Sequence, residues 1–137
     1  MIVVDSNLIG YLYLSGERSA QAEQVLRQDA HWAAPLLWRS EFRNVLALYL
    51  RKNILSLEAA REIMEEATRL MQGQEYDVVS SQVLQLAAQS KCSAYDCEFV
   101  ALAQDLGVAL VTVDKQVLAQ FPEIALLPET YLARRSK

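Results

Sequence analysis

The sequence predicts an α/β fold with three layers, in which helices cover both faces of a mainly parallel sheet. Short apolar runs typical of buried strands alternate along the chain with longer segments whose apolar side chains recur at helical spacing. The composition agrees, because 53% of the 137 residues are hydrophobic and there are only four glycines and three prolines. An aspartate stands at the end of the first apolar run and directly after the clearest one.

Two strands and three helices are expected in the first half of the chain. Residues 2–5 form a short apolar run that ends in Asp5, and the segment 32–37 is a second such run, broken by Pro35. Helical spacing of apolar residues, or a serine at the start, predicts helices at 17–28, from 38 to 52, and from Ser56 to near Gly73.

The second half continues the alternation and ends in a helix. Its clearest strand is the apolar run 108–113, with Asp114 at its end. The helix before that strand stops at Gly107, a common residue at helix C-termini. The full set of elements expected here is a strand at 76–79, helices at 80–90 and 93–106, the strand at 108–113, a short helix, a weak strand around 124–127 and a helix from about Pro128.

Length and composition indicate one domain, spanning residues 1–137, that is long enough to bury a substantial core. No apolar run approaches the roughly 20 residues that cross a bilayer. The N-terminal residues 1–5 lack the basic stretch and the cleavage site of a secretory signal. We therefore expect a cytoplasmic protein without a membrane partner.

The scarcity of histidine and cysteine restricts the chemistry of any active site. One histidine and two cysteines supply neither a zinc ligand set nor a disulfide framework. Acid–base chemistry must therefore rest mainly on carboxylates or on water activated by a metal ion. The formal charge of −4 gives the whole chain no attraction for nucleic acid, so a nucleic-acid partner would need a local basic patch.

Two candidate site residues, Asp5 and Asp114, stand at the ends of predicted strands. In an open parallel sheet, ligands bind in the crevice beyond the carboxyl ends of the strands, so both side chains can face such a crevice. An aspartate after a strand is also a frequent N-cap of the next helix, and this reading stays open for both residues.

Two further acids lie on predicted helices. Asp96 belongs to a helix that is apolar on nearly every side, which indicates burial and an inward carboxylate. The alternative is a capping box in which Ser93 caps the helix. Glu41 lies beside the apolar stripe of its helix, where an unpaired glutamate is rare. The alternative there is an ion pair with Arg39, Arg43 or a neighbouring helix.

Four carboxylates that converge on one pocket would form an unusual group. Like charges close together repel and raise one another's pKa values. A hard divalent cation such as Mg²⁺ or Mn²⁺ relieves this repulsion, because such ions prefer oxygen ligands. It also orients a substrate phosphate and activates water near neutral pH. The acids therefore point to a metal-dependent hydrolase of phosphate esters.

Four segments of the chain resemble the PIN-domain family, and within it the bacterial and archaeal VapC-type toxins. Each segment alone is unspecific, whereas all four in this order and spacing, over essentially the whole chain, are a strong match. The segments are 3–7 (VVDSN), 40–46 (SEFRNVL), 93–103 (SAYDCEFVALA) and 110–115 (LVTVDK).

The resemblance implies an endoribonuclease that hydrolyses RNA with Mg²⁺ or Mn²⁺ and leaves a 5′-phosphate. It further implies a three-layer PIN-like fold with a parallel five-stranded sheet, a homodimer, and an antitoxin partner in a type II toxin–antitoxin pair. By the family pattern, Asn7 is a polar site residue near the first acid and Thr112 supplies a site hydroxyl. The metal-coordinating acids of that pattern fall on Asp5, Glu41, Asp96 and Asp114.

Basic and aromatic residues near these acids suggest where partners bind. Arg39 and Arg43 lie on the helix that carries Glu41, and we expect them to contact the RNA. Arg43 could instead hold Glu41 when no metal is bound. The apolar and aromatic run 11–14 is assigned to the core or to a dimer interface.

Two other functions compete with the ribonuclease. An aspartate-based phosphotransferase needs an acid where Asn7 stands, and a response-regulator receiver needs acids where Ser6 and Ser80 stand. The other competitor is a non-catalytic PIN scaffold that binds RNA or protein, since a fold does not fix a function.

Overall fold

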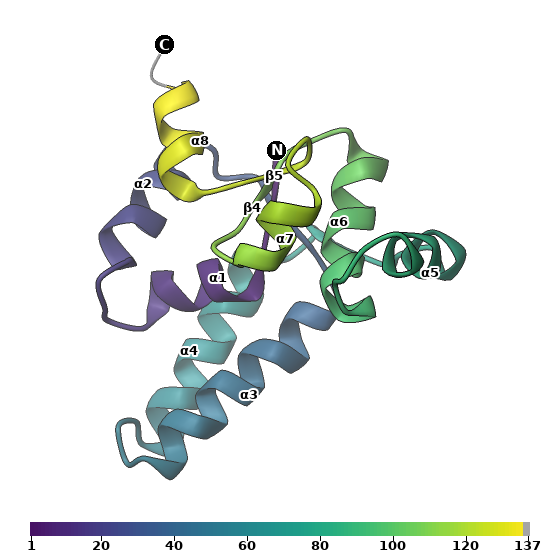
Figure 1. Cartoon of the computed structure of the whole chain (residues 1–137). Helices are drawn as coiled ribbons and strands as arrows, with labels where there is room; N and C mark the ends of the chain where they lie inside the picture. Colours follow the sequence, from purple (N-terminus) through teal and green to yellow (C-terminus); the bar gives the residue numbers. More distant parts are fainter. Residues whose placement is uncertain (136–137) are drawn as a thin grey trace.

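Five short strands and eight helices make up the computed structural model, which describes residues 1–135 (Figure 1). The last two residues of the predicted domain, 136–137, lie outside the described part. The strands are β1 (Ile2–Val4), β2 (Trp32–Pro35), β3 (Glu75–Tyr76), β4 (Leu110–Val111) and β5 (Ala125–Leu126). The helices are α1 (Ser6–Tyr13), α2 (Ser19–Gln28), α3 (Leu37–Arg51), α4 (Leu57–Leu70), α5 (Ser80–Ala88), α6 (Ala94–Leu106), α7 (Lys115–Gln120) and α8 (Pro128–Arg135).

The strands form one parallel sheet in the order β3-β2-β1-β4-β5. The central strand β1 pairs with β2 on one side, where Val3 lies opposite Ala33, and with β4 on the other, where Val4 lies opposite Val111. The chain leaves β1 and β4 at the same edge of the sheet, so Asp5 and Asp114 are brought to that edge as expected.

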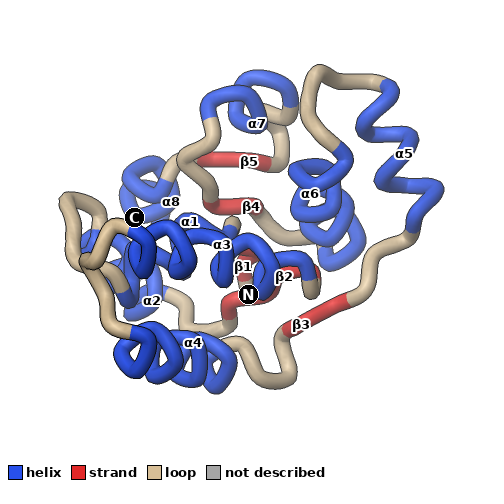
Figure 2. The backbone as a smooth tube through the Cα atoms, turned by 90° about the horizontal axis from the view of Figure 1, so that it is seen from below, coloured by secondary structure: helices blue, strands red, loops and turns tan. Residues whose placement is uncertain are grey.

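Helices lie on both sides of this sheet, which confirms the predicted three-layer α/β/α fold. Figure 2 shows α5 and α6 on one side of the strands and α1, α2, α4 and α8 on the other. Helices α3 and α4 pack against each other and extend away from the sheet (Figure 1). None of the described helices has the length and apolar character needed to cross a membrane.

The core forms where the sheet meets the helices. Val3, Val4 and Val111 of the central strands are fully buried, because helices cover both faces of the sheet. Trp32 and Trp38 are also fully buried, and Trp38 stacks at a tilt against the Phe42 ring, with the ring centres 6.2 Å apart. Burial of these rings fixes α3, and therefore Glu41, relative to the sheet.

Helix α1 is the one large element missing from the sequence-based assignment. The run 11–14, assigned to the core or to an interface, is its last part and the residue that follows it. Asp5 begins the helix by accepting a hydrogen bond from the Leu8 amide. The helix was not recognised because it is only eight residues long, contains no charged residue and begins two residues after β1, so its apolar side chains read as a continuation of the apolar run of the strand.

The predicted strand 108–113 is shorter in the structure, where only Leu110 and Val111 are paired as β4. The reason lies in its neighbours: β5 has two residues, and only Val3 and Val4 of β1 face β4. The Thr112 amide still donates to the Leu126 carbonyl at 3.0 Å, and the chain beyond it leaves the sheet and carries Asp114 into the site described next.

Candidate active site

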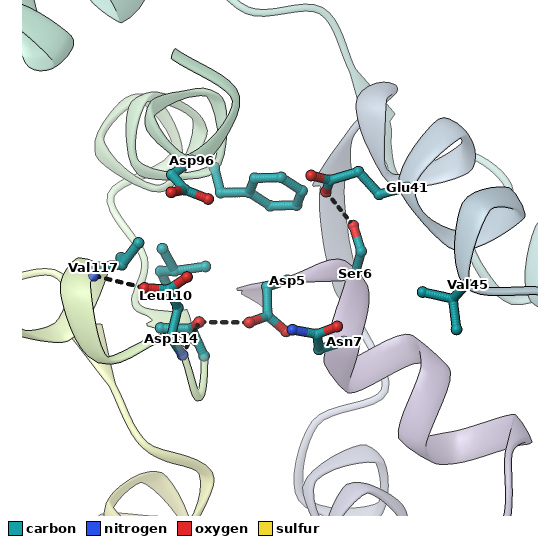
Figure 3. A pocket seen from close by; sticks show the side chains of 11 residues that line it. Asp5, Ser6, Asn7, Glu41, Val45, Asp96, Leu110, Asp114 and Val117 are labelled. Atoms are coloured by element: carbon teal, nitrogen blue, oxygen red, sulfur yellow. Dashed lines mark hydrogen bonds between the residues drawn. The ribbon is translucent and has the colours of Figure 1, made fainter. Parts of the chain in front are cut away.

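The four acids singled out from the sequence line one cavity of about 130 Å³ at the carboxyl ends of β1 and β4. They are Asp5, Glu41, Asp96 and Asp114. Figure 3 shows Asp5 in the middle, with Glu41 on one side and Asp96 and Asp114 on the other. We call this cavity the acid pocket. Asn7 and Thr112, the two other predicted site residues, line it as well.

Asp5 is the most strongly held of the four carboxylates. Its Oδ1 accepts a hydrogen bond of 2.9 Å from the Leu8 amide, and its Oδ2 accepts one from the Thr112 hydroxyl. Burial raises the pKa of Asp5 from 3.8 to about 6, although these hydrogen bonds oppose the rise. The negative charge of Asp114 raises it further. A carboxylate with so high a pKa is poorly compensated by the protein around it.

Glu41 reaches the acid pocket from the first turns of α3. Its Oε1 accepts a hydrogen bond of 2.6 Å from the Ser6 hydroxyl, which follows Asp5 directly in the chain (Figure 3). Burial raises the pKa of Glu41, and the charge of Asp96 adds to this effect. Ser6 was not among the predicted site residues, because no local pattern reveals a contact between residues so far apart in sequence.

Asp96 lies in the first turn of α6, and its side chain is half-buried. Ser93 caps this helix by accepting a hydrogen bond of 3.1 Å from the Asp96 amide. The cap that served as the alternative reading is therefore present, and the carboxylate lines the acid pocket at the same time. Burial raises the pKa of Asp96, and the charge of Asp114 contributes.

Asp114 combines a cap and a place in the site in the same way. Its Oδ1 accepts hydrogen bonds of 2.9 and 3.0 Å from the Gln116 and Val117 amides and begins α7. The Asp114 amide in turn donates to the Thr112 hydroxyl at 3.1 Å. Since that hydroxyl donates to Asp5, Thr112 links the two strand-end acids to each other.

The predicted basic residues lie elsewhere. Arg39 donates from Nε and Nη2 to the carboxylate of Glu75 on β3, the second bond being 2.6 Å long. Arg43 donates to the Arg39 carbonyl at 3.1 Å and reaches the Ser40 hydroxyl at 3.4 Å. Of the described side chains that line the acid pocket, none is basic. The contact of Arg39 and Arg43 with RNA therefore stays a prediction, and Glu41 has no ion pair in the described part of the chain.

The oxygen-rich acid pocket suits a hard cation, although the side chains of the pocket, as placed, do not form a complete coordination shell. Four carboxylates, two hydroxyls and one amide side chain supply oxygen donors, and three of the acids have raised pKa values. In residues 1–134, no three acidic, histidine or cysteine side chains stand close enough together to hold an ion as placed. A cation bound here would draw the carboxylates together.

Comparison with known proteins identifies the family of the chain. The family model of the PIN domain matches residues 2–124. The chain belongs to the PIN-domain family. A curated relative of this PIN protein, Ribonuclease VapC3 from Pyrobaculum aerophilum, is 31% identical over 126 residues, which are 90% of this chain and 96% of the relative. This membership argues against the phosphotransferase and receiver alternatives.

Solved structures share the PIN fold of this chain. The crystal structure of PAE2754 from Pyrobaculum aerophilum has a TM-score of 0.78 and 22% identity, over 98% of this chain and 96% of that one. FitAcB from Neisseria gonorrhoeae has a TM-score of 0.74 and 17% identity, over 94% of this chain and 99% of that one. A chain in a toxin–antitoxin complex from Klebsiella pneumoniae has a TM-score of 0.65 and 19% identity, over 93% of this chain and 98% of that one. At these identities the likeness establishes the fold.

Proposed function

We propose that the protein is a metal-dependent endoribonuclease that hydrolyses RNA phosphodiester bonds, and that it is the toxin of a type II toxin–antitoxin pair. One observation supports this most: four carboxylates from four separate elements line a single pocket that contains no basic side chain among its described residues. Membership of the PIN family and the 31% identity to a protein named as a ribonuclease support the choice of RNA as substrate.

In this proposal Asp5, Glu41, Asp96 and Asp114 hold Mg²⁺ or Mn²⁺. A divalent ion supplies charge neutralisation at the phosphate and activation of the attacking water. The chain itself orients the ligands, because Thr112 positions Asp5 and Ser6 positions Glu41 through hydrogen bonds. The raised pKa values describe the ion-free pocket, and a bound cation would favour the ionised form of each acid.

The wider setting follows from the same family. We infer an antitoxin protein as partner, since one of the structural neighbours is a toxin–antitoxin complex. A homodimer and a cytoplasmic location complete the proposal, and the exposed apolar side chains of Leu84 and Tyr95 are candidates for a dimer contact.

A cleavage assay tests the proposal. Single-stranded RNA with a fluorophore and a quencher is incubated with the wild type in Mn²⁺, in Mg²⁺ and in EDTA, beside Asp5→Asn and Asp105→Asn. Asp105 is an exposed acid outside the acid pocket and serves as the matched control. We expect cleavage that needs the metal, is lost in Asp5→Asn and is kept in Asp105→Asn. No cleavage of any RNA tested would favour the non-catalytic scaffold.

A further inference from the structure

A second cavity, here called the α1–α3 groove, opens beside the acid pocket. Its volume is about 430 Å³, within the range of sites that hold small organic ligands. Ser6, Asn7 and Val45 line both cavities, so the groove continues the acid pocket along the surface between α1 and α3. Figure 3 shows Asn7 and Val45 on the side of the acid pocket that is opposite Asp114.

Two tyrosines give this groove an aromatic lining. Tyr11 on α1 and Tyr49 on α3 both line it and are half-buried. Neither hydroxyl has a hydrogen-bond partner among the described residues, whereas that of Tyr13, two residues after Tyr11, donates to the Glu66 carbonyl. Burial is the main cause that raises the pKa of Tyr11, and the negative charge of Asp5 raises it further. The positive charge of Arg18 lowers it. Tyr11 therefore lies within electrostatic reach of both the acid pocket and Arg18.

Arg18 supplies the positive charge that the acid pocket lacks. Among the described residues that line the two cavities it is the one basic side chain, and Glu17 is the one acid that lines the groove alone. The Nη1 atom of Arg18 donates to the Gln21 side-chain oxygen at 2.9 Å. The same atom lies 3.8 Å from the carboxylate of Glu129, whose side chain is 54% exposed. An exposed ion pair of this length holds an arginine weakly, so Arg18 is free to turn to a phosphate.

We propose that the α1–α3 groove binds one unpaired nucleotide of the RNA, the neighbour of the nucleotide whose phosphate lies in the acid pocket. The base packs against the rings of both Tyr11 and Tyr49, and the phosphate that follows it contacts Arg18. This inference rests on the proposed function, and it assigns a subsite of this chain to one base of the substrate.

Physical chemistry favours this occupant over a duplex. Proteins recognise unpaired bases by stacking them on aromatic side chains, and such stacking tolerates any base. A base inside a helix is already stacked on its neighbours and cannot offer its face to a tyrosine. The groove carries one cation and one acid of its own, so a neutral base with a single phosphate suits it better than a dense array of charges.

Measurements of RNA binding test the aromatic lining of the groove independently of cleavage. The affinity of a labelled single-stranded oligoribonucleotide is measured by fluorescence anisotropy with Mg²⁺, in an Asp5→Asn background that does not cut it. We expect Tyr11→Leu and Tyr49→Leu to weaken binding about tenfold, whereas Tyr11→Phe, which keeps the ring, stays within about twofold of its parent. Tyr13→Leu, on the same helix but outside the groove, is the matched control.

The salt dependence of the same affinity tests Arg18. Losing one phosphate contact lowers the slope of log K against log salt by about 0.7 for a single strand, and we expect this change in Arg18→Gln. A purely structural role of Arg18 would leave the slope unchanged. Glu129→Gln removes the competing carboxylate and should not weaken RNA binding.

The outcomes separate this inference from the proposed function. Tyr11→Leu binding as tightly as its parent, or Tyr11→Phe binding as weakly as Tyr11→Leu, would overturn the inference even if the wild type cuts RNA. It would point to a protein segment as the occupant of the groove. Conversely, the groove variants could lose affinity for RNA while the wild type shows no metal-dependent cleavage. That result would support the nucleotide site in the groove and refute the proposed nuclease activity.

Discussion

Replacing Asp5 by asparagine should stabilise the metal-free protein at neutral pH. Burial raises the pKa of this carboxyl from 3.8 to about 6, so the folded state pays for its ionisation. Asparagine keeps the shape and can still accept from the Leu8 amide, because it is a good N-cap. It can also still pair with the Thr112 hydroxyl, which is able to reverse its direction. The variant therefore removes the charge and keeps the contacts.

The pKa shift fixes the size and the pH range of the effect. Below pH 3.8 Asp5 is protonated in both the folded and the unfolded chain, and the variant gains nothing. Between 3.8 and about 6 the unfolded chain ionises first, which favours unfolding of the wild type. Above about 6 both states are ionised, and a shift of roughly two pKa units corresponds to about 3 kcal/mol. We expect about 2–3 kcal/mol of added stability at pH 7.

Urea unfolding in EDTA, followed by the fluorescence of the buried Trp32 and Trp38, measures this difference at pH 4 and at pH 7. Asp105→Asn is the control, and an exposed substitution of this kind should change stability by less than about 0.5 kcal/mol. Asp5→Asn could instead be less stable than the wild type at pH 7, or its gain in the free energy of unfolding could be equal at both pH values. Either result would show that the folded protein compensates the charge of Asp5 well.

Three other substitutions have expected effects. Thr112→Val removes the hydroxyl that holds Asp5 and should reduce metal-dependent RNA cleavage at least tenfold, whereas Thr112→Ser retains most of it; a cleavage time course decides. Glu75→Gln breaks the charged contact with Arg39, whose side chain is 40% exposed, and should lower the free energy of unfolding by about 1 kcal/mol in urea titrations. Gly107→Ala should cost about 1 kcal/mol, measured in the same way, because this residue ends α6 with a φ of 66°.

Much of the fold was predictable because the strands and most of the helices have clear patterns. The apolar runs that became β1 and β4 were found. β1 ends directly before Asp5 as expected, whereas β4 is shorter than expected and ends at Val111, three residues before Asp114. Parallel pairing of these two strands then brings Asp5 and Asp114 together without further information. Helix α1 was missed because it is short and uncharged and follows the apolar run of β1 almost directly, and its start is marked only by the cap at Asp5.

The four acids of the pocket, together with Asn7 and Thr112, were predicted from the sequence, but the contacts that hold them were not. Inward placement of Glu41 and Asp96 followed from the apolar faces of their helices. The contacts of Ser6 with Glu41 and of Arg39 with Glu75 join elements that are distant in the chain, and such pairs leave no local sequence pattern. Arg39 and Arg43 line neither cavity, and their contact with RNA stays a prediction. Arg18, which lines the α1–α3 groove, was not singled out because no local sequence pattern marks its place beside α1 and α3.

The central claim is that the four carboxylates bind divalent cations, and a crystal of the wild type soaked in Mn²⁺ tests it most directly. We predict an anomalous difference peak inside the acid pocket, in contact with Asp5 and at least one of Glu41, Asp96 and Asp114. An Asp5→Asn crystal treated in the same way should show a weaker peak or none. A fully soaked wild-type crystal with no Mn²⁺ in that pocket would contradict the claim.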